Sequence, residues 1–361
     1  MQYWQVKIFY NSNDEQLYEQ LLAPLSNALA VKNYFAWTVT RDWKSGPHFL
    51  LTFCTENYFF SEEVKTLTLK AIVAFLSEFP SKQYDIDGYK RTHAILSKVE
   101  NVTIESDQLA ENNTFQQGYI SEMVLAEKLE SVLQFKSIFS IQQELSRFII
   151  RNRADRKVSL EKLTFELLML LATSYPPVPS VDGVFKEYSG FLSYHSNFVF
   201  WHHSLEQTQQ VQIMDKIETE FQAKKAQYDS WLTQLIDKLG QENSRQSQLS
   251  SLLIRYFLTY TQMAKEKDIH CRSPYPREKL AKVDQVSDFH KTFFYDQDGN
   301  ASGFPTEFSG YRWLLNIIYK ILPLLNVSPL GRQAYNYQLS KLYEQNDGKI
   351  NQLRQQMYLN Y

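Results

Sequence analysis

Segments with strand character are confined to the first 60 residues of this 361-residue chain. Residues 3–10, 34–40 and 48–54 are rich in aromatic and β-branched side chains, which favour extended backbone. Between the first two segments, leucines recur at helical spacing. Residues 41–47 (RDWKSGP) have the composition of a hairpin loop. The chain is therefore predicted to begin as strand, helix, strand, strand.

The rest of the chain is predicted to be mostly helical, because apolar residues recur there at helical spacing. Residues 101–130 are the exception and are expected to be irregular up to a helix start near Ser121. A proline cluster at residues 176–179 follows a strong helix and predicts a sub-boundary near residues 175–180. The predicted helices are 61–78 with Ser61 as N-cap, 159–174, 213–239, 311–325, and 329–346 with Pro329 in its first turn.

Composition excludes several classes of protein. A net charge of -2 argues against nucleic-acid binding by bulk charge. Two cysteines, Cys54 and Cys271, rule out a disulfide framework and fit a reducing compartment. The first residues lack a signal-peptide pattern, and the longest apolar stretch, residues 165–172, is too short to span a bilayer. We therefore expect a cytoplasmic protein with neither nucleic acid nor membrane as partner.

Motif searches give no metal or cofactor site. His202 and His203 are adjacent and must point apart, and no acid stands at ligand spacing beside them or His195. The chain has no glycine-rich phosphate loop, no HExxH, no GxSxG and no CxxC. We therefore predict no metal and no cofactor. Aromatic residues reach 15% of the chain, which fits an aromatic-walled site or a bulky core equally well.

Both ends of the chain resemble one known family. At the start, the strand–helix opening and the aromatic strand lead to Gly46-Pro47-His48 and a further strand. At the end, residues 311–319 (YRWLLNIIY) precede residues 325–329 (LNVSP) and Arg332. This order is similar to the elimination domain of class I lanthipeptide dehydratases and to stand-alone thiopeptide-type bacteriocin biosynthesis proteins. The resemblance implies a single α+β unit over residues 1–361, with an antiparallel ferredoxin-like sheet, covering helices, a long helical insertion and a helical C-terminus.

Departures from the family pattern point to one of its branches. Eliminating members carry arginines after Pro-His, where this chain has residues 49–52 (FLLT). Residues 112–118 (NNTFQQG) replace a charged glycine-rich segment, and residues 332–337 lack a late histidine. Expelling glutamate needs a cation, because arginine binds carboxylate. The chain therefore resembles the pyridine synthase branch. Such cofactor-free enzymes join two dehydroalanines of a leader-bearing peptide by a formal aza-[4+2] cycloaddition, giving a pyridine-centred macrocycle with leader loss.

The resemblance and the chemistry together select candidate residues. Cycloaddition requires two alkenes held in place, a proton donor and a base. In this interpretation His290 shuttles protons, Tyr295 or Tyr311 donates to the reacting amide, and Ser309 and Asn316 orient it. Ordinary structural roles, such as a helix cap for Ser309, remain open. The predicted catalytic residues are His290, Tyr295, Ser309, Tyr311 and Asn316; the predicted substrate-binding residues are Arg41, Trp43, Lys44, His48 and Arg312.

Partners and alternatives follow from the same interpretation. The expected partner is a leader-bearing precursor peptide, captured by the first hairpin or by an exposed strand edge, with other pathway enzymes nearby. A homodimer is compatible with this prediction. One alternative is the glutamate-elimination subunit of a split dehydratase, and another is a non-catalytic module that presents the peptide. The elimination alternative requires cations from elsewhere, and the candidates are Arg91, Arg147, Arg151, Arg153 and Arg272.

Overall fold

The computed structural model describes residues 1–43, 46–83, 85–90, 109–127, 129, 131–179, 187–269, 306–359 and 361. The chain divides into two compact units. Unit 1 comprises Met1–Leu160 and Lys320–Asn326, and unit 2 comprises Glu161–Tyr319 and Val327–Tyr361. The first division lies at Leu160, ahead of the proline-rich segment at which the sequence predicted a sub-boundary. Helix α7 (Leu160–Ser174), in which most side chains are buried, begins at this division.

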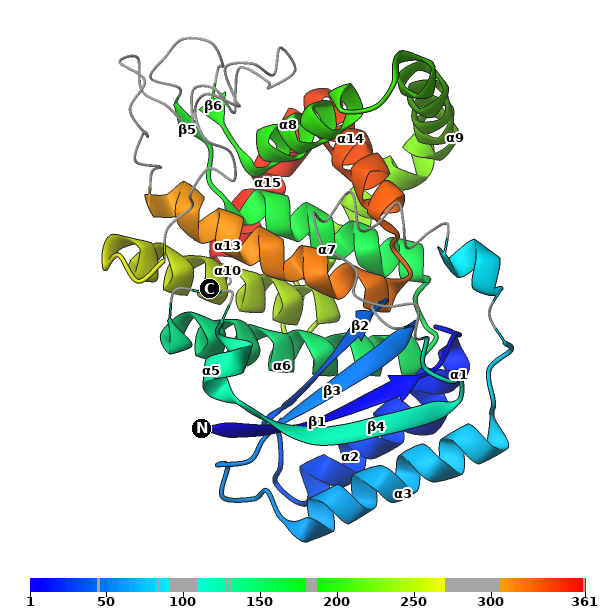
Figure 1. Ribbon diagram of the computed structural model, residues 1–361. Coiled ribbons are helices and arrows are strands. Elements are labelled where there is room, and N and C mark those ends of the chain that lie inside the picture. Colours follow the sequence, from blue (N-terminus) through cyan, green and yellow to red (C-terminus); the bar gives the residue numbers. More distant parts are fainter. Residues whose placement is uncertain are drawn as a thin grey trace. The chain divides into compact units, whose positions relative to one another are not determined.

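Unit 1 contains a four-stranded antiparallel sheet, which confirms the fold that the family resemblance implied. The sequence itself predicted three of its four strands. The strand order is β2-β3-β1-β4, which with the intervening helices is a ferredoxin-like topology. Figure 1 shows α2 and α3 on one face of this sheet and α6 across the other. The elements of unit 1 are β1 (Gln2–Phe9), α1 (Glu15–Leu17), a π-helical turn η1 (Tyr18–Leu22), α2 (Ala23–Val31), β2 (Trp37–Asp42), β3 (His48–Cys54), α3 (Glu62–Glu78), β4 (Thr114–Ser121), α5 (Glu122–Leu125), α6 (Val132–Ala154) and a 3-10 turn η2 (Leu322–Leu325).

Alternation along β1 gives the sheet two apolar faces. Trp4, Val6 and Ile8 are buried on the face covered by α2 and α3. On the other face Tyr3 packs edge-on against Phe135 and Phe139 of α6, at 5.2 and 5.1 Å between ring centroids. Aromatic side chains thus contribute to the core of unit 1 on both faces of the sheet.

Strand β4 was not predicted. The sequence indicated irregular structure there, because Gln116, Gln117 and Gly118 carry weak strand propensity. The segment nevertheless pairs with β1 residue for residue over eight positions. Pairing with a buried strand therefore overrides local propensity. The helix start predicted at Ser121 is confirmed, since its side chain accepts from the Val124 N–H at the beginning of α5.

A short C-terminal segment completes unit 1. Arg153 of α6 is 2% exposed and donates from both terminal nitrogens, to the Glu15 carboxylate, to Asn13 and to the Leu324 carbonyl. Asn13 also donates to the Pro323 carbonyl at 2.8 Å. The turn η2 is therefore fixed to the N-terminal sheet unit by a buried cation and its neutral partners.

Most described residues of unit 2 are helical, and two short paired strands are also present, β5 (Val178–Pro179) and β6 (Glu187–Tyr188). The predicted helices α7, α9 and α14 are confirmed, and Ser328 caps α14 with Pro329 in its first turn. The sequence did not predict the last helix, α15. The helices of unit 2 are α7, α8 (Gly190–His203), α9 (Gln207–Leu239), α10 (Arg245–Lys265), α13 (Thr306–Ile321), α14 (Pro329–Gln345) and α15 (Asp347–Leu359).

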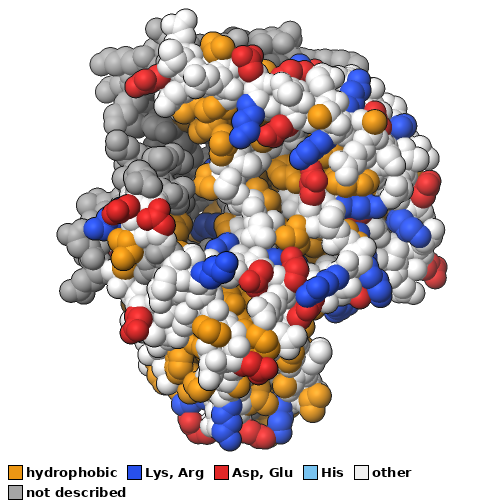
Figure 2. Space-filling model, turned by 90° about the vertical axis from the view of Figure 1, so that its right-hand side faces the viewer, with side chains coloured by type: hydrophobic (Ala, Val, Ile, Leu, Met, Phe, Trp, Pro, Cys, Tyr) orange, Lys and Arg blue, Asp and Glu red, His pale blue; other side chains and the backbone are white. Residues whose placement is uncertain are grey.

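On the face shown in Figure 2, lysine and arginine side chains are interspersed with aspartate and glutamate, as the small net charge predicts. In the described ranges, no single helix combines the length and apolar character needed to cross a membrane. Only α13 with η2 and α14, taken together as a bent pair, meet that test.

Candidate active site

Helix α13 of unit 2 presents the candidate residues on two different faces. Ser309, Arg312, Asn316 and Tyr319 follow one another at spacings of three, four and three residues, which places them on one face of the helix. Ser309 is buried, whereas Arg312 is half-buried and Asn316 is exposed. Tyr311 lies on another face. The predicted residues of α13 therefore form one polar stripe plus a separate core tyrosine.

Tyr311 is a core residue of unit 2. It is 0% exposed, and its ring stacks on that of Tyr175 at 5.3 Å between centroids. Its hydroxyl donates to the Gly190 carbonyl at 3.3 Å. Burial raises its pKa well above the ordinary value. Tyr311 thus holds α13 against the start of α8, and its phenol stays neutral at ordinary pH.

A close contact between backbones fixes the position of α13. At Gly310 an added Cβ would lie 2.6 Å from the Thr261 backbone nitrogen of α10. Only glycine permits α13 and α10 to approach this closely. The polar stripe that begins at Ser309 is therefore held by a rigid helix and not by a loop, which favours precise placement of its side chains.

The stripe ends in a hydrogen-bonded cluster that joins three helices. The Tyr319 hydroxyl donates to Asn336 Oδ1 of α14 at 2.8 Å. Asn336 is 0% exposed, and its Nδ2 donates to Asn197 Oδ1 of α8 at 3.1 Å and to Gln333 Oε1 at 3.3 Å. Every hydrogen-bonding atom of the Asn336 amide is thus engaged. The network fixes the direction of the Tyr319 hydroxyl. The residue as a whole is half-buried.

Two arginines bring positive charge to Tyr319. The Arg332 guanidinium carbon lies 4.8 Å from the centroid of the Tyr319 ring. Burial raises the pKa of Tyr319 to about 12, while the charges of Arg332 and Arg312 act in the opposite direction. Arg332 Nε is buried and has no hydrogen-bond partner among the described residues. Tyr319 is therefore a neutral proton donor at ordinary pH, beside cations that would stabilise its phenolate.

In unit 1, Arg41 and His48 point to opposite faces of the sheet. Arg41 pairs with Phe49 across β2 and β3, and Asp42 pairs with His48, so consecutive positions alternate in direction. Arg41 stacks on the Phe49 ring at 5.5 Å and donates to the Asn11 carbonyl at 3.1 Å. Burial lowers the pKa of Arg41. These two predicted substrate-binding residues do not share one surface.

His48 and Trp43 hold the ends of the first hairpin. His48 is buried, and its Nδ1 lies 2.9 Å from the Gly46 carbonyl, to which the neutral ring donates. Burial lowers the His48 pKa, which keeps the ring neutral. The Trp43 N–H donates to Asp42 Oδ1 at 2.6 Å, and the Tyr89 hydroxyl donates to the Trp43 carbonyl. Lys44, His290 and Tyr295 lie outside the described residues.

Two of the arginines that the elimination alternative requires have structural partners in unit 1. Arg153 is paired with Glu15 inside the core. Arg147 lies over the Phe35 ring at 5.7 Å and donates to the Phe35 carbonyl at 2.8 Å. Arg91 and Arg272 lie outside the described residues. In unit 2, Arg312 and Arg332 bring positive charge to Tyr319.

Sequence reasoning selected Arg312 and Asn316 but not Tyr319, Asn336 or Asn197. The spacing held part of the signal: Tyr319 continues the stripe of α13, and Arg332 and Asn336 are one helical turn apart on α14. Asn197 had no such signal, because its contribution depends on the packing of α8 beside α14. His195, His202 and His203 all lie on α8, and no group of three metal-ligating side chains occurs in the described parts of the chain.

Comparison with known proteins finds similar structures but no similar sequences. No family model and no curated protein sequence matches this chain. The pyridine synthase TbtD, from thiomuracin biosynthesis, aligns with a TM-score of 0.61 at 12% identity, over 96% of this chain and 99% of TbtD. TsrL aligns with a TM-score of 0.59 at 14% identity, over 98% of both chains. The chain therefore has the fold of these two proteins over essentially its whole length, as the sequence resemblance predicted.

A third likeness is more distant. The tRNA-dependent lantibiotic dehydratase MibB from Microbispora sp. 107891 aligns with a TM-score of 0.41 at 14% identity, over 96% of this chain and 28% of MibB. No conclusion is drawn from it.

Proposed function

We propose that this chain matures a ribosomally made peptide by joining two dehydroalanines in a formal aza-[4+2] cycloaddition. The observation that carries the proposal is the coverage of the fold likeness, which spans 96% of this chain and 99% of the pyridine synthase TbtD. The family resemblance at both ends of the sequence supports it independently. The expected product is a pyridine-centred macrocycle, released with loss of water and of the leader peptide.

The polar cluster of unit 2 supplies groups that such a reaction needs. The amide of one dehydroalanine must react as its imidic-acid tautomer, which becomes a 2-azadiene. Two carbon–carbon bonds to the second alkene then close the six-membered ring. The former amide oxygen leaves as water, and elimination of the leader amide completes the aromatic ring. Tyr319 is a neutral phenol of fixed position, and it would protonate that oxygen by moving its proton from Asn336 Oδ1 to the substrate.

Neighbouring residues would assist by position and charge. Asn316 is exposed one turn before Tyr319 and offers an amide that both donates and accepts. Arg312 and Arg332 would stabilise negative charge on Tyr319 after proton transfer, since both cations already act on its phenol. The predicted proton shuttle His290 and donor Tyr295 stay part of this proposal. Little else is needed, because holding two alkenes together supplies much of the rate enhancement.

The same two arginines favour one alternative function, glutamate elimination from a glutamylated serine or threonine. That reaction expels a carboxylate, which arginine binds well. The sequence lacks the arginines of eliminating members after Pro-His, but Arg312 and Arg332 bring two positive charges to Tyr319. The two functions therefore differ in what the arginines bind: the Tyr319 phenolate in one, and the leaving glutamate in the other.

Mass spectrometry with two leader-bearing peptides separates these functions. One peptide carries two dehydroalanines and azoles, and the other is glutamylated at serine. Loss of water and leader from the first, with new pyridine absorbance, is the expected result. Loss of glutamate from the second, with the first unchanged, would establish elimination instead. If both peptides stay unchanged while the leader binds, the chain is a presenting module and cycloaddition is excluded for these substrates.

A further inference from the structure

The two edge strands of the unit 1 sheet differ in how far other described elements cover them. At the β2 edge, Ser146 of α6 accepts from the Val39 N–H and donates to the Val39 carbonyl, each at 3.2 Å. Helix α6 therefore covers that edge. At the β4 edge, Gln116, Gln117, Gly118 and Tyr119 are all exposed. No described residue pairs with the outer side of β4, which Figure 1 shows along the front of the sheet.

Backbone alternation identifies the open hydrogen-bonding groups of β4. The Glu122 N–H donates to the Met1 carbonyl at 2.9 Å, which makes that pair a hydrogen-bonded one. In an antiparallel ladder such pairs alternate, so Ile120, Gly118 and Gln116 bond to β1. The N–H and C=O groups of Phe115, Gln117 and Tyr119 therefore point away from the sheet.

This edge lacks the features that usually prevent strand addition. Thr114–Ser121 contains no proline and no charged residue. Its register with β1 is continuous, so no bulge interrupts it. Long, flat, neutral edges are a hazard that natural proteins normally avoid. An edge left in this state is best explained by a strand that binds there.

We infer that β4 binds an extended segment of the substrate peptide as a fifth strand of the sheet, with its leader as the bound segment. The inference rests on the proposed function for the identity of that peptide. Strand addition depends mainly on main-chain hydrogen bonds, so it tolerates a variable peptide sequence. Specificity then comes from a few side-chain contacts.

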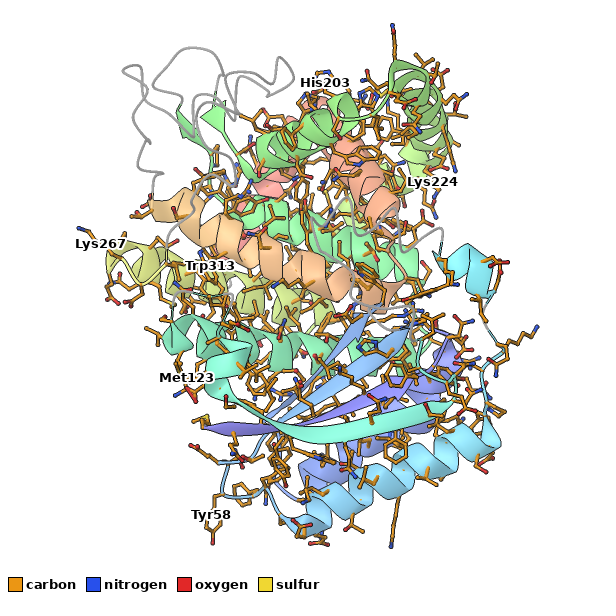
Figure 3. The ribbon with its side chains drawn as sticks, viewed as in Figure 1. Tyr58, Met123, His203, Lys224, Lys267 and Trp313 are labelled. Carbon is orange, nitrogen blue, oxygen red and sulfur yellow. The ribbon has the colours of Figure 1, made fainter. Side chains whose placement is uncertain are left out.

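Side chains around β4 define what the peptide carries. Lys7, opposite Gln116 in the register, is exposed and has no carboxylate partner among the described residues. An acidic residue on the added strand would pair with it. Beyond the end of β4, Met123 and Val124 are 71% and 54% exposed, and Met123 projects outward in Figure 3. An apolar residue of the peptide would be buried against them.

A second copy of the chain is a poorer occupant of this edge. Two β4 strands would pair over at most eight residues each, a small contact compared with the roughly 1,200 Å² of a stable interface. A flexible peptide can instead follow the strand and continue onto Met123 and Val124. The occupant is therefore an extended peptide with an acidic residue beside Gln116, on the sheet face that carries Lys7, and an apolar residue beyond Tyr119.

The test is binding of a fluorescein-labelled leader peptide, taken from the precursor encoded in the same gene cluster. Gln117→Pro removes one outward N–H, and edge strands tolerate proline where that N–H faces solvent. Gln117→Ala is the matched control, because it loses the same side-chain contact to Trp4 but keeps the N–H. We expect the proline variant to raise Kd by roughly tenfold and the alanine variant by less than about threefold.

Hydrogen exchange of backbone amides tests the inference on the wild-type chain, so the result does not depend on whether a variant folds. Leader binding should slow exchange at the Phe115, Gln117 and Tyr119 amides of the wild-type chain. N-methylation of alternate leader residues should abolish binding in one register and spare it in the other. Protection elsewhere with β4 unchanged, or equal binding by both Gln117 variants, would overturn the inference. So would slowed β4 exchange that depends on protein concentration without leader, since the occupant would then be a second copy.

Binding and turnover are measured separately, so the two proposals can fail independently. If the leader protects β4 but the bis-dehydroalanine peptide is not converted, the edge site stands and cycloaddition fails. If the peptide is converted while β4 exchange is unaffected, cycloaddition stands and the edge site fails.

Discussion

The guanidinium carbon of Arg153 lies 3.7 Å from the centroid of the Tyr18 ring, and both side chains donate to the carbonyl of Leu324. Arg153 is thus held by a cation–π contact, a carboxylate and a backbone oxygen at once. The carbonyl comes from η2, more than 150 residues later in the chain. One buried cation therefore connects three distant segments of unit 1.

Replacing Arg153 should destabilise unit 1 strongly. Arg153→Met keeps the volume but removes the guanidinium from Glu15 and Asn13 and leaves the Leu324 carbonyl with Tyr18 as its remaining donor, a loss of about 3 to 5 kcal/mol. Lys32→Met is the control, because Lys32 and Glu63 form an exposed pair worth less than about 1 kcal/mol. Urea unfolding measures both. A change below about 1 kcal/mol for Arg153→Met would mean that this network does not hold η2 in place.

Glycine-to-alanine substitutions at two helical positions should have opposite effects. Gly310→Ala places a methyl group 2.6 Å from the Thr261 nitrogen, so we expect a loss of about 1 to 3 kcal/mol from overpacking. Gly348→Ala meets no atom within 4 Å and should stabilise α15 by roughly 0.5 kcal/mol. Thermal unfolding of both variants checks the pair. Equal effects would show that α13 and α10 can separate freely.

Removing the Tyr319 hydroxyl should slow the proposed reaction without unfolding the protein. Tyr319→Phe deletes the proton donor, and loss of a general acid typically costs about 10²- to 10⁴-fold in kcat. Tyr337→Phe is the control, since Tyr337 sits on the adjacent helix and donates instead to Glu218 at 2.6 Å. Single-turnover mass spectrometry compares them. Equal rates for the two variants would remove Tyr319 from the mechanism.

Alkaline pH should destabilise the chain in a defined window. Burial raises the pKa of Tyr18 and of Tyr319 to about 12, against an unfolded value of 10.0. The neutral phenols are favoured in the folded state, so their stabilising effect is complete below pH 10 and is lost as the pH rises towards 12. Tyrosinate absorbance and the unfolding free energy should change together there. Titration of all tyrosines near their ordinary pKa would contradict this packing.

Local chemistry in the sequence predicted most of the fold. Ser61 caps the helix at which its side-chain chemistry placed it, and Pro329 lies in the first turn of its helix as predicted. The hairpin before His48 also forms as its turn residues indicate. Strand β4 escaped prediction because its stability comes from pairing with β1 and not from its own residues. Local patterns report local preferences, whereas pairing partners are set by tertiary contacts.

The candidate site was less accessible from sequence for the same reason. Arg312 and Asn316 were selected because they are polar residues ahead of the terminal helix pair that the family resemblance identifies, and their roles stay predictions. The partnership of Tyr319 with Asn336 depends on how α13 meets α14, and no spacing along the chain encodes it. Arg41 and His48 were grouped because they are close in sequence. Side chains alternate between the two faces along a strand, so the register of β2 with β3 places Arg41 and His48 on opposite faces of the sheet.

The return of η2 to unit 1 has a consequence for synthesis. Residues emerge from the ribosome in order, and N-terminal units usually fold first. Here the Leu324 carbonyl that Arg153 and Tyr18 share becomes available only after most of unit 2 has been translated. Until then Arg153 of the nascent sheet unit lacks one of the acceptors to which its guanidinium donates in the complete fold. The N-terminal unit is thus the first to begin folding and must wait for nearly the whole chain to finish.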